Sequence, residues 1–338
     1  MMKFKLFVIK ILRLFQRIIC RIKYQIIVSK RKNISVYDTK KLSQDIPLSI
    51  IFNLKYEKNN SNLFYNNASN LKKYGGLSSK YKIPYAIEHG IYLDNRAWLI
   101  DIESDTTGII TFSDYRKQVL SRITNKPVVP IGPYIHYVDS YLSPQEIEEE
   151  RKKLGHTLLV FLSHSTNYID VTLNYEKERQ HFLEIGKDFD TIMICLYWKD
   201  ALVGVAQQFS QTKFRCVTAG HIFDPLFLSR LKSIIQLSDQ TMSTSLGTHL
   251  GYCIYLGKPH YTYFTQKIIE SIGPVKRHWE NIGKEEQDNT KDLIMDNFSR
   301  FQNYIDPDQK KVVEYIWGTN HIKTKKEMYD ILYGNGLN

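Results

Sequence analysis

The stretch that decides the fold is L-S-D-Q-T-M-S-T-S-L-G-T-H-L-G-Y-C-I-Y-L-G-K-P-H-Y-T-Y, at residues 237–263. It predicts a strand ending in hydroxyl side chains, a turn at Gly247, a helix over residues 248–256 and a further strand after Pro259. Backbone N–H groups in the first turn of a helix lack intrahelical partners, so one interpretation is a phosphate site. The other is that the Ser and Thr side chains only cap the helix.

The composition is that of a globular chain. Its 338 residues are enough for about two domains, and 43% of them are hydrophobic. The net charge of +11 is concentrated in residues 1–33, which hold ten Lys or Arg and no acid, and the other basic residues nearly equal the 35 acidic ones in number. A nearly neutral body argues against nucleic-acid binding. The four scattered cysteines predict neither a disulfide framework nor a metal site, and no cofactor is expected.

Residues 1–33 form a basic arm. The spacing of its charged and apolar residues predicts a helix on which the two kinds occupy different faces. The charged face holds Lys10, Arg13, Arg17 and Arg21, and the apolar face holds Phe7, Ile11, Phe15, Ile18 and Ile22. Its uncharged runs are too short to span a bilayer, and no signal-peptide pattern is present. We expect a peripheral helix that binds an anionic membrane surface. The alternative is a domain-packing helix with a solvated charged face.

Residues 34–138 are predicted to form a first Rossmann-like domain. The expected strands are residues 47–54, 83–88, 98–102, 108–112 and 127–131, with a helix at 114–123 and a polar loop at 57–80. Ligands bind beyond the carboxyl ends of parallel strands, which makes Glu88 and His89 candidates for acid/base catalysis. His89 could instead be a strand-end residue bonded to a carbonyl. Other acids of the following loops could equally supply the base, namely Asp94, Asp101, Glu103 and Asp105.

A charged helix at residues 139–156 links this domain to a second one at residues 157–272. Strands are expected at 157–162, 191–197 and 214–218, with helices at 175–185 and 226–235. Small or hydroxyl residues follow three strands, and their convergence predicts a nucleotide-phosphate site. The residues are Ser163, His164, Ser165 and Thr166, then Gly220 and His221, then Ser243, Thr244, Ser245, Thr248 and His249. Helices in residues 273–338 are expected to pack back on both domains.

Several known site patterns are missing from the sequence. There is no P-loop and no G-x-G-x-x-G, which argues against P-loop NTPases and NAD enzymes. There is also no D-x-D pair of the kind that bridges a metal to a nucleotide sugar. The sequence therefore predicts a site that works without a metal.

Two passages resemble GT-B glycosyltransferases, in particular the bacterial enzymes of capsule and lipopolysaccharide assembly. I-P-Y-A-I-E-H-G at residues 83–90 is similar to the strand-then-H-G element of the acceptor-side domain. S-D-Q-T-M-S-T-S-L-G-T-H-L-G-Y-C-I-Y-L-G-K-P at residues 238–259 is similar to the donor-side loop and helix. The resemblance implies a sugar transferred from a nucleotide sugar to a lipid-linked or growing surface polysaccharide.

The resemblance also implies roles for particular residues. His89 would be the base or would position the acceptor, while Ser243, Thr244, Ser245 and Thr248 would hold the donor phosphate. His249 stands near the position where many such enzymes have a ribose-binding Glu, which favours a CMP-linked acidic sugar as donor. Two other activities fit the same fold, a CDP-alditol phosphotransferase and a nucleotide-sugar epimerase.

Overall fold

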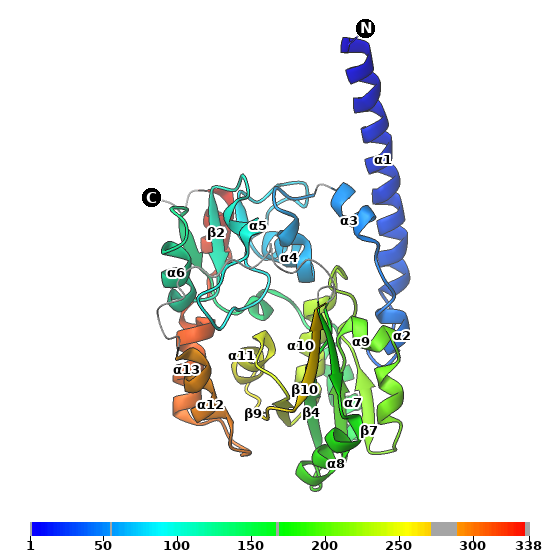
Figure 1. Cartoon of the computed structure of the whole chain (residues 1–338), viewed down its shortest axis with the longest axis vertical. Helices are drawn as coiled ribbons and strands as arrows, with labels where there is room; N and C mark the ends of the chain where they lie inside the picture. Colours follow the sequence, from blue (N-terminus) through cyan, green and yellow to red (C-terminus); the bar gives the residue numbers. More distant parts are fainter. Residues whose placement is uncertain (1, 55, 167–168, 272–288, 335–338) are drawn as a thin grey trace.

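The computed structural model describes residues 2–54, 56–166, 169–271 and 289–334. The predicted α/β class with parallel sheets is confirmed. A three-stranded parallel sheet has the order β1-β2-β3, and a five-stranded parallel sheet has the order β7-β6-β4-β8-β9. Figure 1 shows the two sheets in different parts of one body, with α1 (Met2–Arg31) standing out from it.

The first sheet is small. Its strands are β1 (Tyr85–Ile87), β2 (Gly108–Thr111) and β3 (Val128–Pro130). Between them lie α5 (Leu99–Ile102) and α6 (Asp114–Ser121), and η2 (Tyr134–Tyr137) follows β3. The Ser113 side chain caps α6, which lies within the predicted helix at 114–123, by accepting from the Arg116 N–H. The Asn62 side-chain amide donates to the Tyr85 carbonyl and accepts from the Ile87 N–H. It therefore occupies the open edge of β1, where a further strand would pair.

Three expectations for the first half of the chain are wrong. Residues 47–54 form a helix, α3 (Leu48–Leu54), because the run buries Ile51 and Leu54 at a spacing of three while Phe52 faces solvent. Residues 98–102 were expected to be a strand and include α5 instead. Residues 57–80 are not a loop but hold η1 (Asn60–Asn66) and α4 (Asn67–Tyr74), in which several polar side chains are buried.

The second sheet follows the prediction closely. Its strands are β4 (Thr157–Phe161), β6 (Thr191–Cys195), β7 (Phe214–Val217), β8 (Gln240–Ser243) and β9 (His260–Thr262). Its helices are α7 (Pro144–Leu154), α8 (Tyr175–Ile185), α9 (Trp198–Leu202), α10 (Phe227–Leu237) and α11 (Thr248–Tyr255), with η3 (Val205–Phe209). Numbered along the chain the strand order is 3-2-1-4-5, so the topology reverses between β4 and β8.

The core lies on both faces of the second sheet. Leu158 and Val160 of β4 face the cluster that includes Phe182 of α8, whereas Leu159 and Phe161 face the larger cluster. That larger cluster also contains buried residues of the first sheet and of the C-terminal helices. An antiparallel pair that the sequence analysis missed, β5 (Ile169–Leu173) with β10 (Lys267–Ser271), lies beside this sheet.

The chain termini pack on opposite parts of the body. At the N-terminal end α1 packs against α3 and is followed by α2 (Thr39–Leu42). At the C-terminal end lie α12 (Thr290–Phe298), α13 (Pro307–Trp317), η5 (Thr319–His321) and α14 (Lys325–Tyr333). α12 contacts β9, α13 contacts α6 and α11, and α14 contacts α4. No helix in the described ranges is long and apolar enough to cross a membrane.

Candidate functional site

The hydroxyl-rich ends of β4 and β8 meet at the point where the sheet topology reverses. The Ser163 N–H donates to Thr244 Oγ1 at 2.6 Å, and the Ser163 hydroxyl donates to the Thr244 carbonyl at 3.1 Å. The Thr244 N–H in turn donates to the Phe161 carbonyl at 3.0 Å. The convergence predicted from the sequence is therefore present for these two strand ends, and ligands of open α/β sheets bind at this kind of place.

Most of the candidate hydroxyls bond to protein groups. Ser243 Oγ lies 3.0 Å from His260 Nε2, and Ser165 Oγ accepts from the Val171 N–H at 3.0 Å. Thr166 Oγ1 accepts from the Ile169 N–H at 3.3 Å. These side chains fix the two loops, and none of them lines the pocket described next.

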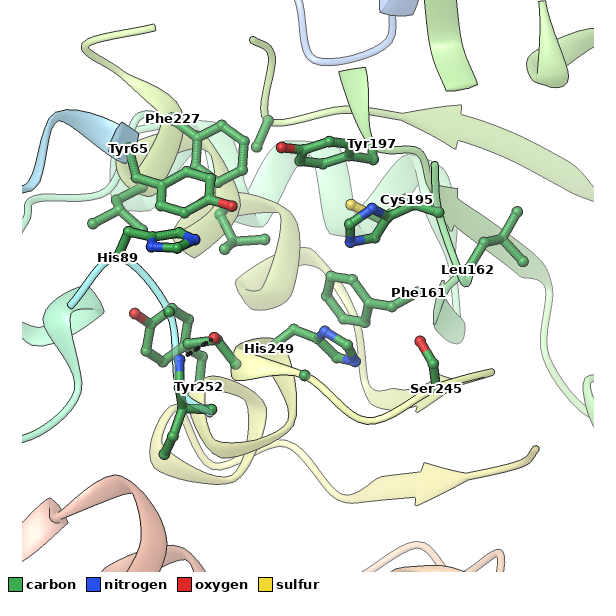
Figure 2. Close-up of a pocket in the computed structure, with 18 of the residues that line it drawn as sticks. Tyr65, His89, Phe161, Leu162, Cys195, Tyr197, Phe227, Ser245, His249 and Tyr252 are labelled. Carbon is green, nitrogen blue, oxygen red and sulfur yellow. Dashed lines mark hydrogen bonds between the residues drawn. The ribbon is translucent and has the colours of Figure 1, made fainter. Parts of the chain in front are cut away.

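A pocket of about 280 Å³ opens beside the junction of β4 and β8, between the two sheets. Figure 2 shows side chains from both halves of the chain around it. Five of the candidate residues line this pocket, His89, His164, Ser245, Thr248 and His249. Gly247 is the N-cap of α11 and no side chain caps this helix, so the interpretation that the Ser and Thr residues only cap it is wrong.

His89 enters the pocket from the first sheet, within an aromatic surround. Its ring centroid is 4.5 Å from that of Trp98 and 5.1 Å from that of Phe64. Nδ1 is buried and has no hydrogen-bond partner within the described residues. Burial lowers the pKa of His89 to about 4, so the ring is neutral at physiological pH. A neutral imidazole with an open nitrogen can accept a proton from a bound hydroxyl.

His249 and His164 lie on the other side, on the second sheet. The His249 ring stacks on Phe161 with centroids 4.6 Å apart, and the His164 ring stacks on Tyr197 at 4.2 Å. Burial, together with a smaller effect of the neighbouring His164, lowers the pKa of His249 to about 3. Its Nε2 is buried without a hydrogen-bond partner in the part of the chain that the structure describes. These imidazoles offer neutral hydrogen-bonding groups to a ligand.

Carboxylates are missing from the pocket wall. Among the described residues that line it there is no Asp, Glu, Lys or Arg. Glu88 points away, where it is fully buried and forms an ion pair of 2.6 Å with Arg116. Asp94 pairs with Arg96, and Asp101 is held by Ser61 and Asn59. Glu103 and Asp105 do not line the pocket either. Of the acid/base candidates near β1, the structure brings only His89 to the pocket.

The third strand end, after β7, serves a different purpose. The Thr218 N–H donates to the Val36 carbonyl, and the His221 N–H donates to the Leu42 carbonyl. His221 Nε2 lies 3.1 Å from Asp45 Oδ1. Thr218 and His221 therefore hold the segment that follows α1, whereas the Gly220 N–H donates to the Thr218 hydroxyl. Only Ala219 of this loop lines the pocket.

Two contacts fix the first turn of α11. The Thr248 hydroxyl accepts from the Ile91 N–H of the loop after β1 at 3.0 Å, which Figure 2 shows as a dashed line. The Thr248 carbonyl accepts from Trp317 Nε1 at 3.1 Å. Trp317 is fully buried against Gly251, where an added Cβ would lie 2.2 Å from the indole Cγ. The helix that borders the pocket is thus held by the first sheet and by α13.

Sequence reasoning missed the aromatic residues of the pocket. They are Tyr65, Tyr92, Phe161, Tyr197, Phe227 and Tyr252. Tyr65 lies in η1 with a positive φ of 53°, an uncommon conformation for this residue type, and its ring packs on Phe227 with centroids 4.6 Å apart. No sequence pattern marks these residues as pocket residues, because they come from separate elements.

Comparisons with known proteins give little further information. No protein-family profile matches the chain, and no curated protein matches its sequence. Among solved structures it is similar to the pneumococcal O-GlcNAc transferase GtfA in complex with UDP and GlcNAc, with a TM-score of 0.30 and 14% identity. The match covers 68% of this chain, which spans only 42% of that chain. A glycosyltransferase is thus a weak structural neighbour, and the match establishes neither a common fold nor a shared activity.

Proposed function

We propose that this protein is a glycosyltransferase with a GT-B-like arrangement, which transfers a sugar from a nucleotide donor to an acceptor hydroxyl. The observation that carries the proposal is the pocket beside the β4–β8 reversal, which receives His89 from the first sheet and His249 from the second. The donor and the acceptor would be held between these two sides of the pocket. Their reaction would then cost little further translational and rotational entropy.

The donor would bind on the side of the second sheet. Its phosphate would face the first turn of α11, where backbone N–H groups of Thr248 and His249 have no intrahelical acceptor. The Ser245 hydroxyl and His249 Nε2 border the same space. As the bond to the sugar breaks, negative charge grows on the leaving phosphate, and the backbone N–H groups and the Ser245 hydroxyl would donate hydrogen bonds that stabilise it.

The acceptor would bind on the side of the first sheet. His89 would take the proton of the attacking hydroxyl on its unpartnered Nδ1. A pKa near 4 makes the His89 imidazole a weak base. A bound phosphate anion would raise this pKa, so His89 would become a stronger base only once the donor is in place.

The acceptor would be a lipid-linked or growing surface polysaccharide, of capsule or lipopolysaccharide type, at the cytoplasmic face of the inner membrane. The support is α1, whose large apolar residues Phe7, Leu12 and Phe15 are each about 60% exposed beside Arg13 and Arg17. A helix with these two kinds of side chain lies flat in an anionic interface. Here α1 would hold the pocket near its acceptor.

The test is product analysis with purified full-length protein in detergent. The protein is incubated with CMP-, UDP-, GDP- and CDP-linked donors and a lipid-linked saccharide, and the freed nucleotide and extended acceptor are measured. The proposal expects nucleotide release that depends on the acceptor and falls by about 10²–10⁴-fold in His89→Gln. Phosphate transferred together with an alditol would identify a CDP-alditol phosphotransferase instead. A changed sugar without acceptor would identify an epimerase.

A further inference from the structure

A lysine that the sequence analysis did not single out lies at the junction of β4 and β8. Lys267 is the first residue of β10, which pairs with β5, the strand that follows the 163–166 loop. Its Nζ lies 3.2 Å from Ser163 Oγ. The antiparallel pair thus brings an ammonium group to the strand end where the candidate donor site begins.

Within the described residues this ammonium group has no counterion. Lys267 is half-buried, and burial lowers its pKa. Across the described ranges it forms no ion pair and bonds only the neutral Ser163 hydroxyl. Two other lysines removed from solvent have a carboxylate partner, since Lys72 pairs with Glu57 and Lys199 pairs with Asp170. Lys232 and Lys258 donate instead to the backbone carbonyls of Val138 and Ser238. A partly desolvated cation is costly without an anion beside it, so a ligand anion fits this place.

The pocket itself supplies no positive charge. Its described lining has no Lys or Arg, and burial keeps His89 and His249 neutral. The Lys267 ammonium group also contributes, after desolvation, to the lowered pKa of the pocket residue His164. Lys267 is therefore close enough to act electrostatically on the pocket while remaining at its edge.

We propose that Lys267 binds the distal phosphate of a nucleoside diphosphate, which makes the donor a nucleoside-diphosphate sugar. This inference rests on the proposed function. The oxygen that leaves the sugar belongs to the distal phosphate, so negative charge increases on this phosphate during transfer. The Lys267 ammonium group would stabilise that charge. A compact ammonium group suits such a phosphate as a point charge. A monophosphate-linked donor such as a CMP-sugar has no distal phosphate for it to bind.

The test is isothermal titration of full-length protein with matched pairs, CDP and CMP, UDP and UMP, and GDP and GMP. Wild type should bind the diphosphate of one base roughly tenfold or more tightly than the monophosphate. Lys267→Met should remove that preference without weakening monophosphate binding, and Lys267→Arg should keep most of it. Lys258→Met is the matched control, because Lys258 is also removed from solvent but bonds the Ser238 carbonyl.

The outcomes separate the inference from the proposed function. Wild-type protein that binds none of these nucleotides overturns the proposed function and the inference with it. Wild type that prefers a diphosphate, with the preference kept in Lys267→Met, overturns the inference alone. Equal affinity of wild type for the two members of a pair also overturns the inference, and it leaves a monophosphate-linked donor as the proposed substrate.

Discussion

Thr248 Oγ1 accepts a hydrogen bond of 3.0 Å from the Ile91 N–H, so one hydroxyl joins the first turn of α11 to the loop after β1. Both residues line the pocket. The bond holds His89, two residues before Ile91, at a fixed place relative to His249, the next residue after Thr248. The bond thus helps to set the separation of the two imidazoles, beside other contacts between the two halves of the chain such as the Tyr65–Phe227 ring contact.

Replacing Thr248 tests this contact. Thr248→Val removes the acceptor and leaves the nearly buried Ile91 N–H unsatisfied, which should lower the free energy of unfolding by about 1–3 kcal/mol. Thr248→Ser keeps the hydroxyl and should cost less than Thr248→Val. Urea unfolding of both variants measures the difference. Equal stability of the two variants would show that the hydrogen bond does not hold the halves together.

Glu88 and His89 are neighbours in sequence, and we expect their replacements to have opposite effects. Glu88→Gln leaves the fully buried Arg116 without its charge partner and should cost about 3–5 kcal/mol of stability. His89→Gln should leave stability almost unchanged and abolish most transfer activity. Unfolding and initial rates per folded molecule distinguish the two. A stable but inactive Glu88→Gln would instead make Glu88 the base.

The contact between Gly251 and Trp317 predicts a large cost for one methyl group. In Gly251→Ala the new Cβ would overlap the indole ring of Trp317, which is fully buried and bonded to the Thr248 carbonyl. Overpacking of this kind costs about 1–3 kcal/mol, and here it would also shift α11. We expect a lower midpoint in urea together with weaker nucleotide binding. Unchanged nucleotide affinity would show that α13 does not position the site.

Stability should rise with pH between 5 and 6.5. Burial is the main cause that lowers the pKa of His89 to about 4 and of His221 and His249 to about 3. The unfolded chain, with histidine pKa values near 6.5, therefore binds more protons in this range. Asp101 opposes this trend, because burial raises its pKa to about 7. Asp101→Asn should therefore steepen the rise in urea stability, and a slope that flattens instead would contradict the assignment.

Membrane binding should depend on the charges of α1. Changing Lys10, Arg13 and Arg17 to Gln should weaken binding to anionic vesicles by about 3 kcal/mol, on the order of a hundredfold. The exposed body residues Lys187, Lys310 and Lys326, changed to Gln, are the matched control. Arg31 is left intact because it is buried beside Asp224 at the base of the helix. Equal sedimentation of both triple variants with vesicles would rule out an electrostatic role for α1.

The strands of the second sheet were predictable because apolar runs there end in clear turn and cap residues. α8 even has the predicted bounds, residues 175–185. Residues 47–54 were misassigned because a short apolar run has no period that separates a helix from a strand. The alternating sequence I-D-V-T-L of β5 is typical of a strand. Its partner β10 lies almost a hundred residues further along the chain, so local sequence does not reveal the pairing.

The candidate site was predictable only in part. The carboxyl ends of strands in the two sheets identified His89, His164, Ser245, Thr248 and His249, all of which line the pocket. The same rule also selected Glu88 and His221, which the structure uses in a buried ion pair and in a contact with Asp45. Side-chain direction and long-range partners decide such cases. Neither is encoded in local sequence spacing.

The most direct test of the central claim is a thermal-shift series of full-length protein with CMP, CDP, UDP, GDP and ADP. A nucleotide at a hundredfold excess over its dissociation constant stabilises the folded state by about 2.7 kcal/mol. We predict a shift with at least one of the five, lost when Ser245→Ala and His249→Gln are combined and kept when Ser243→Ala is made at the buried His260 contact. No shift with any of the five, or a shift that survives the Ser245 and His249 changes, would contradict a nucleotide site in this pocket.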